Sequence, residues 1–185
     1  VAKLFVVSGP SGAGKGTLVT RVRERRSNLG LTVSATTRAP RKGEGDGVNY
    51  FFLTREEFDR RVANGEFVEW AEVHGNCYGT LVSEVQSKLA SGSSLILEID
   101  VQGALQVKER FPEAVLIFIK PPSLEVLRER LVGRGTETPE TIELRMANAA
   151  HELALADRYD DVVVNDDLDR ATDELVRVLD MHERI

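Results

Sequence analysis

A glycine-rich loop between an apolar segment and a helical pattern is the feature that most restricts the fold of this 185-residue chain. Residues 3–7 are apolar and largely β-branched, residues 9–16 contain four glycines, and residues 17–26 follow helical spacing. Strand, glycine loop and helix in this order open a parallel α/β fold. The N-terminal part of the chain is therefore predicted to begin such a fold.

The loop itself, GPSGAGK over residues 9–15, matches the first seven positions of the Walker A pattern. Such a loop turns its backbone N–H groups towards a phosphate at the start of a helix, and its lysine reaches the β and γ phosphates. A tight turn that binds nothing is the alternative, and the flanking strand and helix disfavour it. The predicted phosphate-binding residues are Gly9, Ser11, Gly12, Ala13, Gly14, Lys15, Gly16 and Thr17.

Three further apolar runs, at residues 94–99, 115–119 and 162–164, are separated by helical patterns. Nearly continuous apolar strands suit a parallel sheet that is covered on both faces. We therefore expect an α/β fold of the P-loop NTPase type, with a parallel sheet and helices on both faces. Two stretches interrupt the alternation and predict an inserted mixed α/β lobe and a helical lid.

The inserted lobe is predicted over residues 35–81 and the lid over residues 133–156 of a single domain, with the core in residues 1–34, 82–132 and 157–185. Within the lobe, Thr54 and Glu57 have the spacing of a helix-capping box, and Trp70 is expected in the lobe's core. Glycines flank the start of the lid, as a hinged helical segment requires.

Acidic residues at the end of the run 94–99 resemble a Walker B arrangement, in which a strand-end carboxylate lies beside the phosphate loop. Gly16 takes the place of the usual Ser or Thr, and the hydroxyl follows at Thr17. This replacement argues against a direct metal bond from position 16, so Mg²⁺ is expected to be held through water by Thr17, Glu98 and Asp100. The alternative for the two carboxylates is a solvated strand end.

The net charge is −6, yet 18 arginines stand against 6 lysines. A negative chain disfavours coating of nucleic acid and binding to an anionic membrane, while single Arg forks still match a phosphate. Arg38 and Arg41, with the phenols Tyr50 and Tyr78, form a candidate second anion site. Taken alone, the two arginines would be a solvated basic loop, and only their pairing with a phosphate loop favours a site.

The class of P-loop protein follows partly by exclusion. The chain has no Asn-Lys-x-Asp motif of the kind that reads the base in GTPases, and helicases and motors usually need a longer chain. A small kinase with a phosphorylated acceptor fits best. The single cysteine excludes an intramolecular disulfide, and no apolar run approaches the length of a membrane span. We expect a cytoplasmic protein with small-molecule partners, no nucleic acid and no membrane.

Several segments, in collinear order over essentially the whole chain, resemble the guanylate kinase family in its bacterial single-domain form. They are SATTRAPRKGE from Ser34, NYFF from Asn49, EFVEWA from Glu66, GNCYGT from Gly75, DVQG from Asp100, GRGTET from Gly133 and VNDDLD from Val164. The resemblance implies transfer of the γ-phosphoryl group of ATP to GMP, with dGMP as a second acceptor and Mg²⁺ as cofactor. It also implies that no general base is needed.

The resemblance assigns roles residue by residue. The family's acceptor-phosphate clamp corresponds to Arg38, Arg41, Tyr50 and Tyr78, and its guanine readers to Ser34, Glu69, Thr80 and Asp100. Its lid arginines correspond to Arg130, Arg134 and Arg145, and Asn165 lies where the family approaches the donor adenine. Among these, the implied ATP-binding residues outside the loop are Arg134 and Asn165, and the implied catalytic residues are Lys15, Arg38, Arg130, Arg134 and Arg145.

The chemistry of the base readers agrees with guanine. A carboxylate such as Glu69 accepts from both N1–H and the N2 amino group, while adenine offers an acceptor at N1, and a buried mismatch of this kind discriminates by about 10⁴-fold. Thr80 is expected to donate to O6. Two alternatives stay open: a guanylate-kinase-like module that binds proteins without catalysis, and a P-loop kinase of another small phosphorylated acceptor.

Overall fold

The computed structural model describes residues 1–184, and Ile185, the last residue of the third predicted core segment, lies outside them. The core is a parallel sheet of four strands in the order β6-β1-β7-β8. These strands span Leu4–Ser8 (β1), Leu95–Glu98 (β6), Val115–Lys120 (β7) and Asp161–Val164 (β8). All five residues of β1 are buried, because this strand lies inside the sheet and is covered from both sides.

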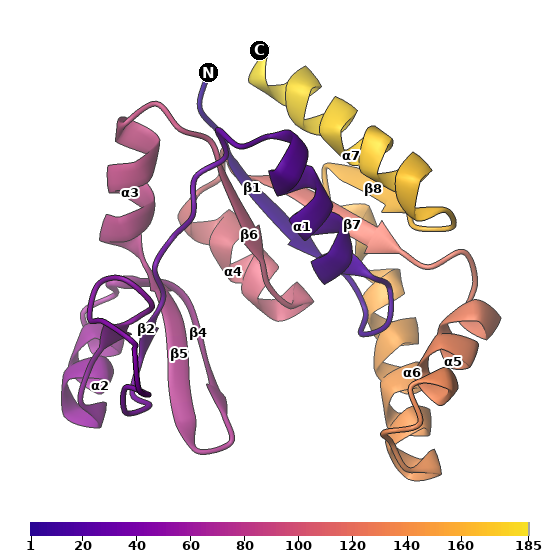
Figure 1. Cartoon of the computed structure of the whole chain (residues 1–185), viewed down its shortest axis with the longest axis horizontal. Helices are drawn as coiled ribbons and strands as arrows, with labels where there is room; N and C mark the ends of the chain where they lie inside the picture. The colour runs from indigo at the N-terminus through magenta and orange to yellow at the C-terminus, as the bar shows by residue number, and fades with distance from the viewer. Residues whose placement is uncertain (185) are drawn as a thin grey trace.

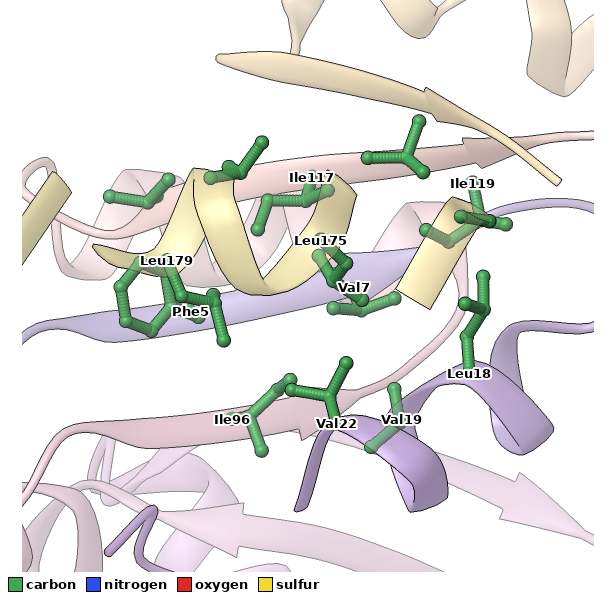
Figure 2. Close-up of a cluster of buried hydrophobic side chains, with 14 of the residues drawn as sticks. Phe5, Val7, Leu18, Val19, Val22, Ile96, Ile117, Ile119, Leu175 and Leu179 are labelled. Atoms are coloured by element: carbon green, nitrogen blue, oxygen red, sulfur yellow. The ribbon is translucent and has the colours of Figure 1, made fainter. Parts of the chain in front are cut away.

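Helices cover both faces of this sheet, as predicted. Alternate residues of β1 point to opposite faces: Phe5 and Val7 pack beneath α1 and α7, whereas Leu4 and Val6 pack towards α3 and α4. Figure 2 shows the first of these clusters, with Leu175 and Leu179 of α7 above β1 and Val19 and Val22 of α1 beside it. The four helices span Lys15–Arg25 (α1), Val82–Ala90 (α3), Val101–Arg110 (α4) and Leu168–Glu183 (α7).

A second sheet, in the order β3-β2-β5-β4, is built from the inserted stretch between α1 and α3. Its elements are Ala35–Thr36 (β2), Phe51–Phe52 (β3), Arg55–Ala63 (α2), Phe67–Val73 (β4) and Asn76–Leu81 (β5). Its own apolar cluster includes Phe58 of α2, Phe67 and the buried Cys77. We call residues 35–81 the second-sheet lobe.

Two details of this lobe bear on the sequence predictions. Thr54 caps α2 by accepting from the backbone N–H of Glu57 at 3.1 Å, as the capping-box spacing predicted. The expectation that Trp70 lies in the lobe's core is wrong, because Trp70 is 42% exposed. Trp70 pairs with Gly79 of β5, and its ring makes an edge contact with the ring of Phe58, so it lies at the margin of the cluster.

A helical pair forms the other projection from the core. The helices α5 (Leu124–Gly133) and α6 (Pro139–Ala154) share a small apolar cluster, which comprises Leu127, Leu131, Ile142, Met146 and Ala149. A short 3₁₀ turn, Ala156–Arg158, then leads into β8. Figure 1 shows the second-sheet lobe and this helical arm on opposite sides of the loop that joins β1 to α1. Any ligand phosphate bound at that loop therefore lies between the two projections.

Within residues 1–184, no helix combines the length and the apolar character that a membrane crossing requires.

Candidate functional site

The glycine-rich loop lies between β1 and α1, where neighbouring atoms leave no room for a side chain at Gly9 or Gly14. A Cβ at Gly9 would lie 2.3 Å from the carbonyl oxygen of Ile119, and one at Gly14 would lie 2.5 Å from Nδ2 of Asn165. Gly14 also has a φ of +84°, a left-handed conformation that glycine adopts without strain. The amide of Asn165 donates to the carbonyl of Ala13 at 2.8 Å and so fixes the loop from β8's side.

A cavity of about 300 Å³ opens over this loop. Lys15 lines it, and its ammonium group donates to the Gly9 carbonyl at 3.0 Å, so it is folded back over the loop. Helix α1 begins at Lys15 and directs its N-terminal end at the cavity, which favours an anion there. The other predicted site residues that line the cavity are Ser11, Gly12, Gly14, Gly16, Thr17, Glu98 and Arg134.

Three predicted arginines of the helical arm lie at this loop. Arg130 donates to the carbonyls of Asn165 at 3.0 Å and Gly12 at 3.4 Å. Arg145 donates to the hydroxyl of Ser11, and its Nε is 2.9 Å from a carboxylate oxygen of Glu137. Arg134, which caps the C-terminal end of α5, lines the cavity directly. The arm thus brings positive charge to the place where a phosphate chain would bind.

The two predicted Walker B carboxylates occupy different positions. Glu98 ends β6 beside Val7 of β1, and its Oε1 is 3.2 Å from where a Cβ at Gly16 would lie. Any side chain at position 16 would therefore press on this carboxylate. Asp100 caps α4 by accepting from the backbone N–H of Gly103 at 2.7 Å. Oδ2 of Asp100 takes no part in this capping hydrogen bond.

Residues 1–184 contain no group of three or more His, Cys, Asp or Glu side chains that could hold a metal ion by themselves. The oxygens of Thr17 and Glu98 at the loop cavity are nonetheless of the hard type that Mg²⁺ prefers. Mg²⁺ usually keeps several waters and binds through one or two carboxylates together with the phosphates of a substrate. The donor set therefore fits an ion that is held mainly by water and nucleotide.

A second cavity, of about 220 Å³, brings together three of the four predicted base readers, Ser34, Glu69 and Thr80. Thr80 donates to Oε1 of Glu69 at 2.9 Å, which leaves Oε2 without this partner. Burial raises the pKa of Glu69, the hydrogen bond from Thr80 opposes that shift, and the negative charge of Asp100 adds to it. Asp100, the fourth reader, does not line this cavity but lies close enough to act on Glu69 electrostatically.

Glu98 lines both cavities. The loop cavity and the Glu69 cavity are therefore neighbours that share one carboxylate.

The predicted clamp residues meet in the second-sheet lobe. The guanidinium carbon of Arg38 is 5.1 Å from the centroid of the Tyr50 ring, and the rings of Tyr50 and Tyr78 are 6.2 Å apart between centroids. The backbone N–H of Arg41 donates to Glu44 at 2.6 Å, and the residue Arg41 is exposed. Neither Arg38, Arg41, Tyr50 nor Tyr78 lines either cavity. The clamp residues therefore form a group separate from the linings of both cavities.

Two acidic residues contact predicted site arginines and were not singled out from the sequence. Glu44 forms a two-pronged ion pair with Arg38, and Glu137 pairs with Arg145. The signal for Glu44 was present, since it is the acidic residue nearest in sequence to the clamp arginine Arg41 in a basic loop. No comparable spacing marks Glu137, because it is eight residues from its partner and joined to it only by the fold.

Comparisons with known proteins agree with this geometry. A family model for guanylate kinase matches residues 1–182. The chain is 53% identical over 176 residues to the guanylate kinase of Halalkalibacterium halodurans, which covers 95% of this chain and 86% of the relative. It is 55% identical over 179 residues to the guanylate kinase of Gloeobacter violaceus, which covers 97% and 87%.

Solved structures give the same result. The crystal structure of guanylate kinase from Anaplasma phagocytophilum matches 98% of this chain and 86% of its own, with a TM-score of 0.70 and 37% sequence identity. The phosphate loop, the fold and the match over nearly the whole length lead to one conclusion: this chain belongs to the guanylate kinase family.

Proposed function

We propose that this chain is an ATP:GMP phosphotransferase, which transfers the γ-phosphoryl group of ATP to GMP, giving ADP and GDP, with dGMP as a second acceptor. The observation that carries the proposal is the pair of neighbouring cavities that share Glu98. One cavity has the phosphate loop and Lys15, and the other has the carboxylate of Glu69 with Thr80. Membership of the guanylate kinase family supports the same assignment.

In the base cavity, the ionised carboxylate of Glu69 accepts from N1–H and N2–H₂ of guanine. Thr80 already donates to one oxygen of that carboxylate, which fixes its orientation. Adenine would place the acceptor N1 against this carboxylate, and the unpaired buried groups would disfavour it. Ser34 and Asp100 complete the recognition of the base. Arg38, Arg41, Tyr50 and Tyr78 hold the phosphate of GMP.

At the donor cavity, Lys15 and the loop N–H groups hold the β and γ phosphates of ATP. The attacking atom is an oxyanion of the GMP phosphate, so no side chain has to remove a proton from it. Catalysis then consists of in-line positioning and of neutralising charge on the transferred group. We assign the second task to Lys15, Arg134 and Arg145, with Arg130 and Asn165 supporting the loop on which the donor lies.

Mg²⁺ is proposed as cofactor, held chiefly by nucleotide oxygens and water near Thr17, Glu98 and Asp100, where it supplies further positive charge to the phosphates. We further propose that the second-sheet lobe (35–81) and the lid (133–156) fold over the two nucleotides and exclude water that would otherwise hydrolyse ATP. Both nucleotides are cytoplasmic metabolites, which supports a cytoplasmic location.

The test is ADP release from ATP and Mg²⁺, measured by a coupled assay with GMP, dGMP, AMP, CMP and UMP in turn. We expect turnover with GMP and dGMP, and rates near the acceptor-free background with the other three. Comparable turnover with AMP would show that Glu69 does not read the base as proposed. No turnover with any acceptor would favour a protein-binding module, which the intact Lys15 and clamp residues disfavour.

A further inference from the structure

The basic loop of the second-sheet lobe contains one ion pair that stands apart from the surface pairs. Nη1 of Arg38 donates to Oε1 of Glu44 at 2.9 Å and Nη2 donates to Oε2 at 3.0 Å, so that each nitrogen meets one oxygen. The side chains are only 13% and 19% exposed. Two-pronged pairs of Arg with a carboxylate are the geometrically most specific ones, and partial burial makes this pair less sensitive to salt.

The carboxylate of Glu44 is itself fixed to the loop. It accepts the backbone N–H of Arg41 at 2.6 Å, while the backbone N–H of Glu44 donates to the carbonyl of Arg41 at 3.0 Å. One carboxylate therefore ties the side chain of one predicted clamp arginine to the main chain of the other. The hydrogen bond from Arg38, followed by that from the backbone of Arg41, lowers the pKa of Glu44 to about 2, so the pair persists at neutral pH.

The hydrogen bonds of Arg38 also show which part of its guanidinium is occupied. Nη1 donates to Glu44 and to the carbonyl of Ala39 at 3.1 Å, and Nη2 uses one of its two hydrogens for Glu44. A guanidinium has five N–H groups, so Nε–H and one N–H of Nη2 are left free of these bonds. These two lie along one edge of the planar group and form a second fork. The ring of Tyr50 lies against the same guanidinium.

We infer that Glu44 is a positioning residue for acceptor binding: it holds the end of the Arg38 guanidinium so that the Nε–Nη2 edge is presented to the phosphate of the acceptor nucleotide. This inference rests on the proposed function, because it takes the acceptor to be a nucleoside monophosphate. Glu44 does not touch the phosphate in this arrangement, and its carboxylate is not displaced when the phosphate binds. It reduces the side-chain freedom that Arg38 would otherwise lose on binding.

The opposite role is that Glu44 imitates the phosphate and blocks Arg38 until the acceptor displaces it. The geometry argues against this, since Glu44 occupies the end of the guanidinium and does not accept from the N–H groups of its Nε–Nη2 edge, and since the backbone of Arg41 holds the carboxylate in place. The two roles predict opposite changes in affinity when the charge of Glu44 is removed.

The test is a double-mutant cycle on the KM for GMP, with variants Glu44→Gln, Arg38→Ala and the pair. We expect Glu44→Gln to raise the KM for GMP about tenfold and to leave the KM for ATP unchanged, because it removes the negative charge that holds Arg38 and the backbone N–H of Arg41, both on the acceptor side. In the Arg38→Ala background, the same change should add little, since its target is gone. A role in lobe folding alone would persist in that background.

A graded variant keeps the test independent of folding. Glu44→Asp keeps the charge but is one methylene shorter, so it cannot reach both nitrogens of Arg38 and the N–H of Arg41 together; we expect an intermediate rise in the KM for GMP. Thermal unfolding checks each variant, and Glu44→Asp is taken through the cycle if Glu44→Gln does not fold. Glu56→Gln is the matched control, because Glu56 lies exposed at the start of α2 in the same lobe.

Four results overturn the inference: an unchanged KM for GMP in Glu44→Gln, a lowered KM, a full additional loss in the Arg38→Ala background, or wild-type affinity in Glu44→Asp. Failure of the proposed function is separate from these, since the wild type and Glu56→Gln would then also fail to phosphorylate GMP.

Discussion

In the second-sheet lobe, Arg38 is held by Glu44, a residue of the same loop, whereas in the helical arm Arg130 and Arg145 reach across to the phosphate loop. Each projection also has its own apolar cluster, around Phe58 in the lobe and around Leu127 in the arm. The cluster of the arm packs on the loop directly: a Cβ at Gly12 would lie 2.8 Å from Cδ1 of Leu127. Among the hydrogen bonds of the described residues, none joins the second-sheet lobe to the phosphate loop.

The two sides of the site thus differ in how their binding residues are held in place. On the donor side, the arginines, the loop and the arm are connected by hydrogen bonds and packing. The acceptor side is ordered within itself by the Arg38–Glu44 pair and the Phe58 cluster, and the proposed closure would bring it towards the loop. Substitutions in the arm are therefore expected to affect ATP and the rate of transfer, and substitutions in the lobe to affect GMP.

The largest expected effect comes from the loop that both sides serve. Lys15→Ala should lower kcat by about 10³-fold or more, because its ammonium group is expected to neutralise charge on the phosphates during transfer. Steady-state kinetics with GMP and ATP measure it. Lys88→Ala on α3 is the matched control, and near-normal turnover of Lys15→Ala would remove the loop from the reaction.

A direct comparison of the two sides uses one arginine from each. Arg145→Ala should lower kcat by about 10²-fold, since Arg145 lies at the donor loop through Ser11, with little change in the KM for GMP. Arg38→Ala should instead raise the KM for GMP most strongly. Equal effects of both variants on both parameters would contradict the division between the two projections.

The pH dependence of GMP use isolates the base reader. Burial raises the pKa of Glu69 above that of an ordinary Glu, which is about 4.3. The Glu69 carboxylate therefore takes up a proton at a higher pH than an ordinary Glu does. The protonated form loses acceptor capacity for N1–H and N2–H₂, so the KM for GMP should rise as pH falls through that pKa, by about tenfold for each unit below it.

Glu69→Gln supplies the control for this profile. Its amide does not titrate, so its KM for GMP should be high already at neutral pH and should lack the contribution of Glu69 to the profile. Titration of the GMP phosphate is common to both proteins and cancels in the comparison. Parallel profiles for the two proteins would assign base reading to another residue.

Truncating one buried side chain in each apolar cluster allows the stability of the two projections to be compared. Leu127→Ala and Phe58→Ala both truncate fully buried side chains and should each lower the free energy of unfolding by about 2–5 kcal/mol. Denaturant unfolding measures that loss. Kinetics should then separate them, with a few-fold higher KM for ATP in the first and for GMP in the second. A higher KM for GMP in Leu127→Ala together with a higher KM for ATP in Phe58→Ala would contradict this assignment of clusters to nucleotides.

The smallest signal is the closure itself. Small-angle scattering should show a lower radius of gyration with GMP and a non-hydrolysable ATP analogue together than with the ATP analogue alone, because GMP is proposed to draw the second-sheet lobe towards the core. An identical profile in both conditions would contradict closure on GMP.

Much of the core could be predicted from local patterns, and much of the lobe could not. Residues 3–26 carry their strand, loop and helix in consecutive sequence, so periodicity and glycines suffice. Strand β5 was not recognised, and Trp70 was placed in the lobe's core because large aromatic side chains are usually well buried. The register shift in β4 between Phe67 and Glu69 has no signal in the residues themselves.

The site shows the same limit. The phosphate loop marked Lys15 directly and its pairing with a basic loop marked Arg38, whereas the role of Glu69 as a base reader came from the family resemblance. The contacts that hold them are long-range: Asn165 meets Ala13 across 152 positions, and Arg145 meets Ser11 across 134. Only the arrangement of strands brings such pairs together. The roles of the individual site residues stay predictions until the variants are measured.

The one cysteine of the chain, Cys77, is buried within the cluster of the second-sheet lobe. Burial raises the pKa of its thiol, which keeps it in the unreactive protonated form. Cysteines introduced at exposed positions, one on α2 and one on α6, can therefore carry a pair of fluorescent labels without competition from the native thiol. The protein thus lends itself to direct measurement of the distance between its two projections as each nucleotide binds.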